Sequence, residues 1–496
     1  MTDRKRLVVN FFVGFFSQFV VLVLGLVVPR IIITNYNSDA NGLIGTVTQI
    51  FTYMALLEAG VAQAARNALF KPLKDDDHQK ISKIISTANR YYTRISIIYA
   101  AAVIVLAAIL PLILKTGISY WQVFIITLIE GSSSVISFFF LQKWITFLSA
   151  KGKNYITNSL ASGGKIIAYG AKITLALLSV NVCFVQIGYL IGTVLQVIFY
   201  QIYIKKHYPW VKCNEDTKGY KLEDRNYYVI TEVAWTIFSS TDMIVLSICI
   251  STSLASVYFV YNMVFVALNT LLTAVYNSVS YKLGKDYAED IEKYKKTHDS
   301  FNSFFMSTIT ILMCVTYWLI IPFVKIYTSG VEDINYVREW LPLLFCAIQM
   351  MTFSRYIAGN LSGLSGYAKQ TSIVSLIEAI INISLSFILV HYFDIVGVLI
   401  ATAIALPLKV VYTNWLAEKK VLKRKPWKTL LIIFTNYSIF AVTVVLKEFV
   451  FNINVTDYFN FALFGFLLTA IYALAVFIIN AIINKQLLLF FKPTKK

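Results

Sequence analysis

Charged residues are scarce in this chain. Only 14% of its 496 residues are Asp, Glu, Lys or Arg, whereas 58% are hydrophobic. A soluble globular domain has about a quarter of its residues charged. Many of the apolar residues must therefore face something other than water, and because long apolar runs recur along the whole chain, that surrounding is lipid. The composition excludes an ordinary soluble protein.

Cysteine and histidine are also few, and neither forms a pattern. The five cysteines stand apart with no CxxC pair, and the four histidines have no ligand spacing. The sequence therefore predicts no disulfide framework and no metal centre. It also lacks the Walker A pattern GxxxxGK[ST] and any loop long enough to fold as a catalytic domain. We expect neither ATP hydrolysis nor another enzymatic activity, and no bound cofactor.

Long apolar runs dominate what is present. A helix needs about 20 apolar residues to cross the hydrocarbon core, and by this measure the chain has about fourteen transmembrane helices. The predicted spans are 8–33, 42–65, 91–114, 119–149, 155–180, 183–204, 228–250, 253–281, 301–327, 340–362, 371–393, 395–416, 429–450 and 457–484. Tight turns must separate the close pairs near Asn181, Ser251 and Asp394. The first run is too long for a signal-peptide core and has no cleavage pattern, so it is an uncleaved helix.

The net charge of +18 is explained by the loops between these spans. Placing the N-terminus inside puts nearly all loop Lys and Arg in alternate loops, and the outer loops carry only Lys115 and Arg338. This is the positive-inside pattern, so we expect both termini to be cytoplasmic. The positive charge needs no nucleic-acid partner.

A faint internal repeat indicates how the helices are grouped. The sequence GYLIGTVL at 188–195 resembles GVLIATAI at 397–404, and both begin the second helix of a predicted hairpin. Parallel repeats of this kind are typical of transporters, whose substrate site lies between the two halves. The predicted domains are one six-helix lobe at 1–226, a second at 227–428, and an additional helix pair with a tail at 429–496.

Several cations lie where lipid should be. Lys165 is near the middle of the fifth predicted helix, and Lys172 follows two turns later on the same face. Arg355 lies in the tenth helix, while Arg30 and Arg66 close the first and second. Charged groups in the bilayer are costly and usually face an aqueous cavity or a partner. A polar cavity, a structural ion pair and, for Arg30 and Arg66, anchoring at the interface all remain open.

A set of carboxylates lies at similar depth. Glu58, Glu130, Asp242 and Glu378 all fall within predicted spans, and Asn382 follows Glu378 by one turn. Such a carboxylate can be neutralised by a raised pKa, by a lysine or by a bound cation. The sequence therefore allows either a site for Na⁺ or H⁺ or a static ion pair with the buried lysines. Other charges near the interfaces, namely Arg94, Lys143, Glu232 and Lys409, are expected to snorkel.

The second predicted helix carries the most specific motif. It reads NGLIGTVTQIF at 41–51, LLEAG at 56–60 and ALFKPL at 68–73, with Pro29 and Arg30 before it. These strings resemble the polysaccharide repeat-unit (Wzx-type) flippases of the multidrug/oligosaccharidyl-lipid/polysaccharide exporter superfamily. The expected fourteen helices and cytoplasmic termini agree with that family over the whole chain.

The resemblance implies a fold, a location in the bacterial inner membrane, a substrate and a site. It implies two six-helix lobes around a V-shaped cavity, and alternating access that moves undecaprenyl-pyrophosphate-linked oligosaccharide from the inner to the outer leaflet. The expected partners are that lipid, the bilayer, and a polymerase with its chain-length machinery. The predicted substrate-binding residues are Arg30, Glu58, Arg66, Lys165, Lys172 and Arg355. The predicted cation-coupling residues are Asp242, Glu378 and Asn382, with Na⁺ or H⁺ as the ion.

Two other functions fit parts of the pattern. A drug/cation antiporter of the same superfamily would usually have twelve helices and an acidic or apolar cavity, which the C-terminal pair and the buried lysines disfavour. A membrane glycosyltransferase or polymerase for the same polymers would normally carry a long outer loop. The outer loops here are short, and even the loop at 329–339 has only about eleven residues. This disfavours a glycosyltransferase or polymerase.

Overall fold

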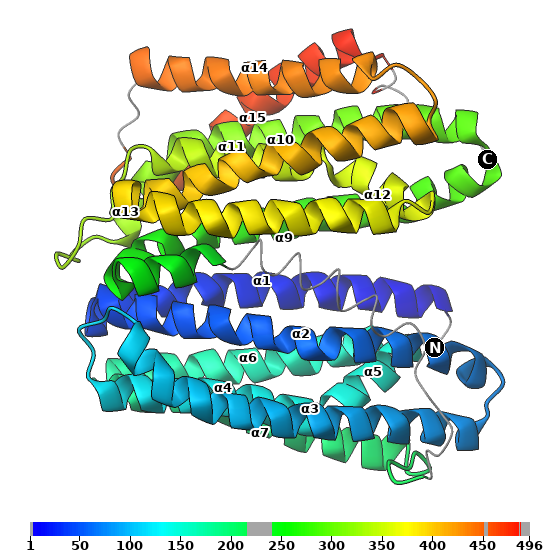
Figure 1. Cartoon of the computed structure of the whole chain (residues 1–496), viewed down its shortest axis with the longest axis vertical. Coiled ribbons are helices and arrows are strands. Elements are labelled where there is room, and N and C mark those ends of the chain that lie inside the picture. The colour runs from blue at the N-terminus through cyan, green and yellow to red at the C-terminus, as the bar shows by residue number, and fades with distance from the viewer. Residues whose placement is uncertain (1–2, 216–240, 451–454, 486, 488–496) are drawn as a thin grey trace. The chain divides into compact units, whose positions relative to one another are not determined.

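The chain folds as helices that lie side by side (Figure 1). The computed structural model describes residues 3–215, 241–450, 455–485 and 487, and this part of the chain contains no β-strand. The helices are α1 (Asp3–Tyr36), α2 (Ser38–Lys74), α3 (His78–Ile113), α4 (Tyr120–Phe140), α5 (Gln142–Ala150), α6 (Asn154–Leu177), α7 (Val182–His207), α9 (Thr252–Glu289), α10 (Ile291–Tyr327), α11 (Leu341–Ser354), α12 (Tyr356–Leu364), α13 (Ala368–Trp415), a π-helix η1 (Leu416–Val421), α14 (Trp427–Phe449) and α15 (Tyr458–Ile483). The predicted all-α class is confirmed.

Most of the described helices overlap predicted membrane spans, while the span predicted at 228–250 lies mostly outside the described residues. Within the described residues, nine helices are long and apolar enough to cross a bilayer. Helices suit this role because their backbone N–H and C=O groups bond within the segment. The predicted break near Asp394 is present: this residue has φ 50° and ψ −129° and divides α13 into two helices. The chain is a multi-pass membrane protein.

Two predicted spans are broken rather than continuous. The span at 119–149 is interrupted between α4 and α5, and the span at 340–362 is interrupted at Arg355, between α11 and α12. The amide of Asn414 donates a 3.3 Å hydrogen bond to the backbone carbonyl of Ser354 beside the second break. This side chain supplies a donor to a backbone group where the helix is interrupted, which a break inside a membrane protein requires.

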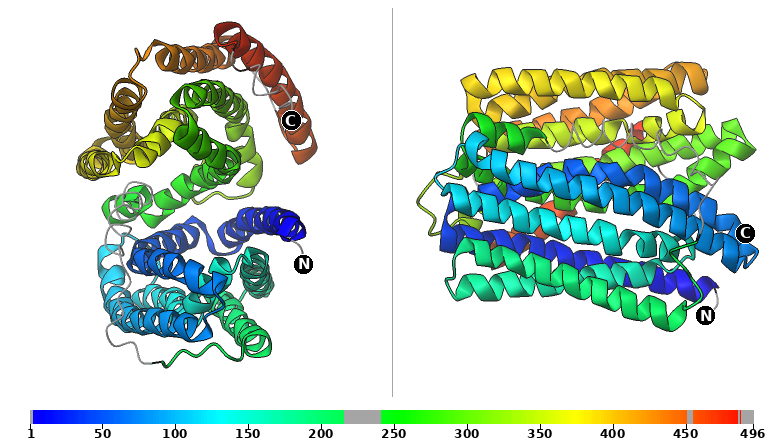
Figure 2. Two further views of the ribbon diagram at one scale, coloured as in Figure 1. Left: turned by 90° about the vertical axis from the view of Figure 1, so that its right-hand side faces the viewer. Right: turned by 60° about the horizontal axis from the view of Figure 1, so that its bottom comes forward.

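The chain forms two compact units, unit 1 (Met1–Ser256) and unit 2 (Val257–Lys496). In unit 1, helices α6 and α7 approach closely at small residues. A Cβ on Gly192 would lie 2.6 Å from the carbonyl oxygen of Gly164, so the contact needs glycine. The end-on view in Figure 2 shows the helices of each unit in cross-section. The predicted boundary at 226/227 lies outside the described residues and stays a prediction.

In unit 2, the C-terminal pair α14 and α15 is held to α10 by buried polar side chains. Asn436 of α14 donates to Asn480 of α15 (2.9 Å) and accepts from the hydroxyl of Thr310 in α10 (2.9 Å). Hydrogen bonds of this kind fix helix contacts in lipid, where apolar burial provides little driving force. The rest of α15 is largely exposed, as a helix bordering lipid would be.

Candidate functional site

Three charged side chains meet inside unit 2. Arg355, at the break between α11 and α12, donates through Nη1 to Oε1 of Glu378 in α13. Lys409, in the second half of α13, places its Nζ 3.9 Å from the other oxygen of Glu378. Arg355 and Glu378 are 4% and 1% exposed. We call Arg355, Glu378 and Lys409 the unit 2 charge triad.

The triad carries more positive than negative charge. Two cations share one carboxylate, so the three groups sum to one positive charge in a largely apolar surrounding. A buried ion pair gains from its mutual attraction but must overcome the desolvation of both ions. Because Glu378 carries a single negative charge, it cannot neutralise both Arg355 and Lys409. An additional anion would therefore stabilise the triad. Lys409 was expected to snorkel, and that prediction is wrong, because its ammonium group turns to Glu378.

The structure also describes the residues predicted to couple a cation. Both carboxylate oxygens of Glu378 face cationic side chains, so the ion-pair alternative describes this residue. Asn382 is fully buried one turn later, and its amide donates to the hydroxyl of Thr402 (2.8 Å). Asp242, 7% exposed, belongs to unit 1 and follows Thr241, whose hydroxyl is 2.5 Å from that of Tyr53 in α2. Cation coupling stays a prediction.

A second buried charge centre lies inside unit 1. Lys172 of α6 and Glu130 of α4 are each 6% exposed, and they are close enough to attract one another electrostatically. The ammonium group of Lys172 lies 5.1 Å from the ring centre of Tyr189 in α7. Thr48 of α2 donates to Oε1 of Glu130 (3.1 Å), while Oε2 is buried without a hydrogen-bond partner among the described residues.

The two lysines of α6 differ in exposure. Lys172 is buried against α7, where a Cβ on Gly188 would lie 3.1 Å from its side chain. Lys165, two turns earlier on the same face, is exposed. The two lysines therefore lie on one face of α6 as predicted, but the side chain of Lys165 is accessible and that of Lys172 is buried. Of these two lysines, only Lys165 can contact a ligand without rearrangement of unit 1.

The remaining predicted substrate residues lie in α1 and α2. Arg30 and Arg66 are both partly buried, consistent with either a polar partner or anchoring near an interface. Glu58 lies in α2, but its side chain is outside the described residues. The predicted set thus divides between the units: Lys165, Lys172, Arg30, Arg66 and Asp242 belong to unit 1, and Arg355, Glu378 and Asn382 to unit 2.

A polar contact that the sequence did not predict joins α2 to residues 241–256. Asp39, at the start of α2, accepts hydrogen bonds from Thr252 and from Thr116 (3.0 Å). Further along α2, Asn41 donates to Ser256 (2.8 Å) and the hydroxyl of Thr46 lies 2.5 Å from that of Ser247. We call these residues the α2 polar contact. Its first part, at Asp39, lies against the 114–119 loop.

Glycine allows this contact to be close. A Cβ on Gly42 would lie 1.7 Å from the backbone carbonyl oxygen of Thr252, a distance that no side chain tolerates.

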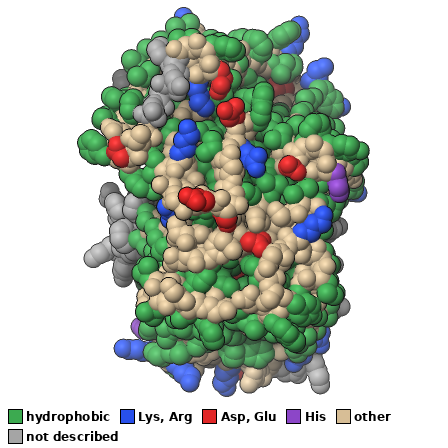
Figure 3. Space-filling view, turned by 90° about the vertical axis from the view of Figure 1, so that its left-hand side faces the viewer, with side chains coloured by type: hydrophobic (Ala, Val, Ile, Leu, Met, Phe, Trp, Pro, Cys, Tyr) green, Lys and Arg blue, Asp and Glu red, His purple; other side chains and the backbone are tan. Residues whose placement is uncertain are grey.

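Figure 3 looks onto the end of the helices that carries the 114–119 loop, and acidic and basic side chains are mixed there. The positive-inside rule predicts this end to be the outer one.

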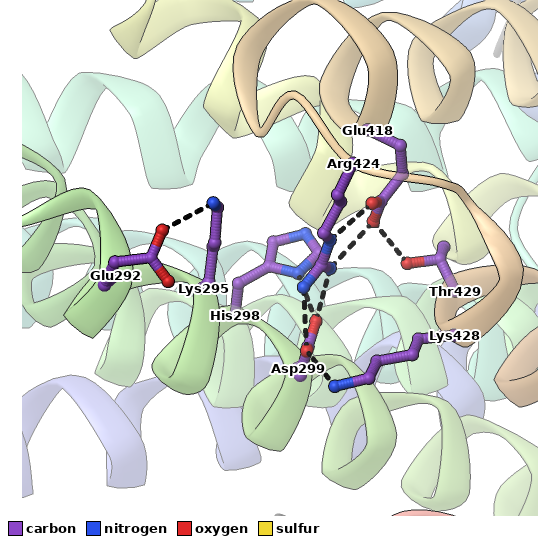
Figure 4. Close-up of polar contacts among 8 residues, drawn as sticks. All are labelled: Glu292, Lys295, His298, Asp299, Glu418, Arg424, Lys428 and Thr429. Atoms are coloured by element: carbon purple, nitrogen blue, oxygen red, sulfur yellow. Dashed lines mark hydrogen bonds and ion pairs between the residues drawn. The ribbon is translucent and has the colours of Figure 1, made fainter.

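A dense ion cluster that the sequence did not predict lies in unit 2, where η1 and the start of α14 meet α10 (Figure 4). Arg424 binds Asp299 of α10 with two nitrogens (2.9 and 2.5 Å) and Glu418 of η1 with two (2.6 and 2.9 Å). Glu418 also accepts from the hydroxyl of Thr429 in α14 (2.6 Å). These residues lie far apart in the sequence, so no local pattern indicated them. The cluster fixes the turn between α13 and α14 on α10.

Replacing Arg424 with alanine should destabilise unit 2. The carboxylates of Asp299 and Glu418 are almost fully buried, and each would lose its main cationic partner. Removing one member of a buried ion pair costs about 3 kcal/mol or more. We expect a lower melting temperature of the purified protein in detergent. The control Lys428→Ala should have little effect, since that side chain is 63% exposed and 3.8 Å from Asp299. Equal melting temperatures for both variants would contradict this role.

Comparison with known proteins agrees with this architecture. A scan against protein-family models and a search of curated proteins give no match. Solved structures do match: the lipid II flippase MurJ in an inward closed conformation aligns with a TM-score of 0.69 and 19% identity, covering 93% of this chain and 97% of its own. An inward-facing multidrug resistance transporter of the MATE family and MOP superfamily aligns with a TM-score of 0.63 and 12% identity, covering 81% and 95%.

A third structure belongs to the same group. A MOP-superfamily transporter from Pyrococcus furiosus, described as having a binding pocket of reversed polarity, aligns with a TM-score of 0.56 and 12% identity over 85% of this chain and 96% of its own. At such low sequence identity, the structural similarity to these three proteins establishes the fold alone. The chain therefore has the helical fold that transporters of the MOP superfamily share.

Proposed function

We propose that this protein is a flippase that moves an undecaprenyl-pyrophosphate-linked oligosaccharide from the inner to the outer leaflet for surface polysaccharide assembly. The observation that carries the proposal is the excess of buried positive charge in the unit 2 charge triad. A pyrophosphate head group is anionic and cannot cross hydrocarbon alone, because desolvating its charge is prohibitive. Cationic side chains held inside a membrane protein lower that barrier.

Arginine is well suited to this substrate. Its planar guanidinium group binds phosphate oxygens through two parallel hydrogen bonds, whereas the lysine ammonium group acts as a compact point charge. Arg355 sits at a helix break rather than in a continuous helix, and Lys409 adds a second charge across Glu378. A cationic drug would be repelled by this combination, which favours an anionic substrate over the drug antiporter alternative.

Transport by alternating access requires one closed end that can open. The α2 polar contact supports this step, because it joins α2 of the first predicted lobe to residues 241–256 of the second predicted lobe, which pack within unit 1. It consists of hydrogen bonds between small polar side chains such as Asn41 and Ser256. Water replaces such hydrogen bonds at small net cost. The contact can therefore separate and re-form during a transport cycle.

Deletion of the gene tests the proposal directly. We expect lipid-linked oligosaccharide to accumulate inside the cell and surface polysaccharide to fall. Repeat units that reach the outer leaflet without being polymerised would instead indicate a polymerase. Unchanged polysaccharide with raised susceptibility to cationic drugs would indicate the antiporter, and both of these outcomes would reject the flippase.

Substitution of the α6 lysines should separate substrate contact from packing. Lys165→Gln should reduce export severalfold while leaving the protein stable, because this exposed ammonium group is available to a pyrophosphate. Lys172→Gln should reduce export and also lower the melting temperature, because Glu130 would lose the buried cation that attracts it. Export is measured as surface polysaccharide in the complemented deletion strain, normalised to protein in the membrane. Wild-type export by the Lys165→Gln, Lys172→Gln double variant would reject both roles.

A further inference from the structure

A compact group of basic and aromatic side chains occupies the end of unit 1 that is predicted to be cytoplasmic. It lies where the α2–α3 turn, the α5–α6 turn and the segment after α7 meet. Its members are Lys151 and Lys153 from the α5–α6 turn, Tyr208 and Trp210 from the segment after α7, and His78 from the start of α3. We call these five residues the lysine–aromatic cluster. Neither the charge triad nor the α2 polar contact includes any of them.

Two ammonium groups converge on one ring in this cluster. The Nζ atoms of Lys151 and Lys153 lie 4.8 and 5.0 Å from the ring centre of Tyr208, and that of Lys151 also lies 5.8 Å from Trp210. Cations are attracted to aromatic faces at such distances. Gly152, between the lysines, has φ +72°, so the turn relies on glycine to bring both side chains to the same ring.

The aromatic rings are fixed by the core of unit 1. Tyr208 is 5% exposed, and its ring packs edge-on against Phe147 of α5 at 5.1 Å. The imidazole of His78 stacks on Trp210 at 3.7 Å between centroids. The lysines are therefore held over a rigid aromatic floor. Such preorganisation reduces the entropy that a ligand must remove on binding.

Three carboxylates near the cluster each have a partner, and one of these partners, His78, is a cluster member. Asp76 lies 3.7 Å from His78, and Asp77 caps α3 by accepting from the backbone N–H of Lys80. Glu215 pairs with Lys212 at 3.9 Å. Lys153 forms no ion pair within the described residues. The adjoining end of α7 adds the exposed Lys205 and Lys206, and Asp75 of the α2–α3 turn offsets part of this charge.

Lys153 also keeps its charge. Partial burial disfavours the ammonium form of Lys153, but hydrogen bonding and attraction to Tyr208 and Tyr203 outweigh it and raise the pKa of this group. Lys153 is therefore protonated at neutral pH. Both ammonium groups lie near the ring of Tyr208, and an anion bound beside them would be attracted by both charges.

We propose that the lysine–aromatic cluster binds the phosphate of an anionic phospholipid, such as phosphatidylglycerol, from the cytoplasmic leaflet. Tyrosine and tryptophan lie at the head-group level of membranes, which places this cluster beside lipid phosphates. The cytoplasmic leaflet is negatively charged and attracts juxtamembrane lysines. Binding anchors the α5–α6 turn at the membrane surface. The inference depends on the membrane location of the chain and is independent of the transported substrate.

The test uses the full-length protein purified in detergent. Native mass spectrometry after incubation with equal amounts of phosphatidylglycerol and phosphatidylcholine measures the ratio of the two bound lipids. We expect the wild type to favour phosphatidylglycerol, and the Lys151→Gln, Lys153→Gln variant to lose about tenfold of that preference. The matched control, Lys369→Gln with Lys425→Gln, removes two exposed lysines without an aromatic contact to any described residue, and it should behave as the wild type.

Two further measurements separate charge from folding and lipid from free phosphate. The Lys151→Arg, Lys153→Arg variant keeps both charges and should retain the lipid preference if charge is what the lipid recognises. Millimolar inorganic phosphate should neither displace phosphatidylglycerol nor raise the melting temperature as the lipid does. Equal lipid ratios for the wild type and the glutamine variant would overturn the proposal. Complete displacement by inorganic phosphate would overturn it as well and would assign the cluster to a free anion.

Discussion

A disulfide between positions 41 and 256 should stop transport completely. Asn41→Cys with Ser256→Cys, made in a background without the five native cysteines, would place two thiols where the native side chains hydrogen-bond at 2.8 Å. Oxidation would join α2 permanently to the start of α9 and keep the α2 polar contact closed. Because alternating access requires this end to open, we expect no export in the oxidised protein. Export is measured with purified protein in liposomes before and after oxidation.

Reduction and a second disulfide control for this effect. Dithiothreitol should restore export, and each single cysteine variant should transport under oxidising conditions. The matched pair Thr310→Cys with Asn436→Cys joins α10 to α14 inside unit 2, at a contact of 2.9 Å. That disulfide should leave export unchanged, since α10 and the C-terminal pair do not connect the two predicted lobes. Full export by the oxidised 41–256 protein would show that the α2 polar contact is static.

Loss of Arg355 alone should damage the protein more than loss of the whole ion pair. Arg355→Met leaves Glu378 buried with only the more distant Lys409 as a partner, and breaking a buried pair in this way costs about 3 to 5 kcal/mol. Arg355→Met with Glu378→Met removes the closest pair and should recover part of the stability, because the remaining cation, Lys409, is only partly buried. We expect neither variant to export, because each removes the guanidinium group that would bind the pyrophosphate. Melting temperature and export together separate the two effects.

A different pattern would contradict the function given to Arg355. If the double variant regains both stability and export, the pair is structural and takes no part in binding. Arg355→Lys provides the finer control. It keeps the charge but loses the bidentate hydrogen bonds, so we expect a stable protein with reduced export.

Helix positions could be predicted from the sequence because lipid imposes a length and composition on every span. The break at Asp394 followed from hydropathy alone, as did the placement of both helices of α13. Breaks inside apolar runs could not be predicted in this way. Arg355 interrupts a continuous apolar stretch, and the interruption is offset by Asn414, which lies 60 positions after Ser354 in the chain.

Partners of buried charges were the least predictable feature. Lys409 lies near a helix end in the sequence, which indicated snorkelling, yet the kink at Asp394 brings the second half of α13 back to Glu378. Glu130 and Lys172 come from α4 and α6, and only their packing around Tyr189 makes them neighbours. The sequence correctly identified which residue types were unusual in lipid. It could not give their partners, because those depend on helix packing between distant segments.

Flipping by purified protein tests the central claim most directly. The protein is placed in liposomes that contain labelled undecaprenyl-pyrophosphate-linked oligosaccharide, and an impermeant glycosidase removes the label from the outer leaflet only. We expect protein-free liposomes to lose the outer-leaflet label alone, and liposomes with the protein to lose all of it. Oxidised 41–256 disulfide protein should behave as protein-free liposomes do. If active protein leaves the inner-leaflet label intact, the chain is not a flippase for this lipid.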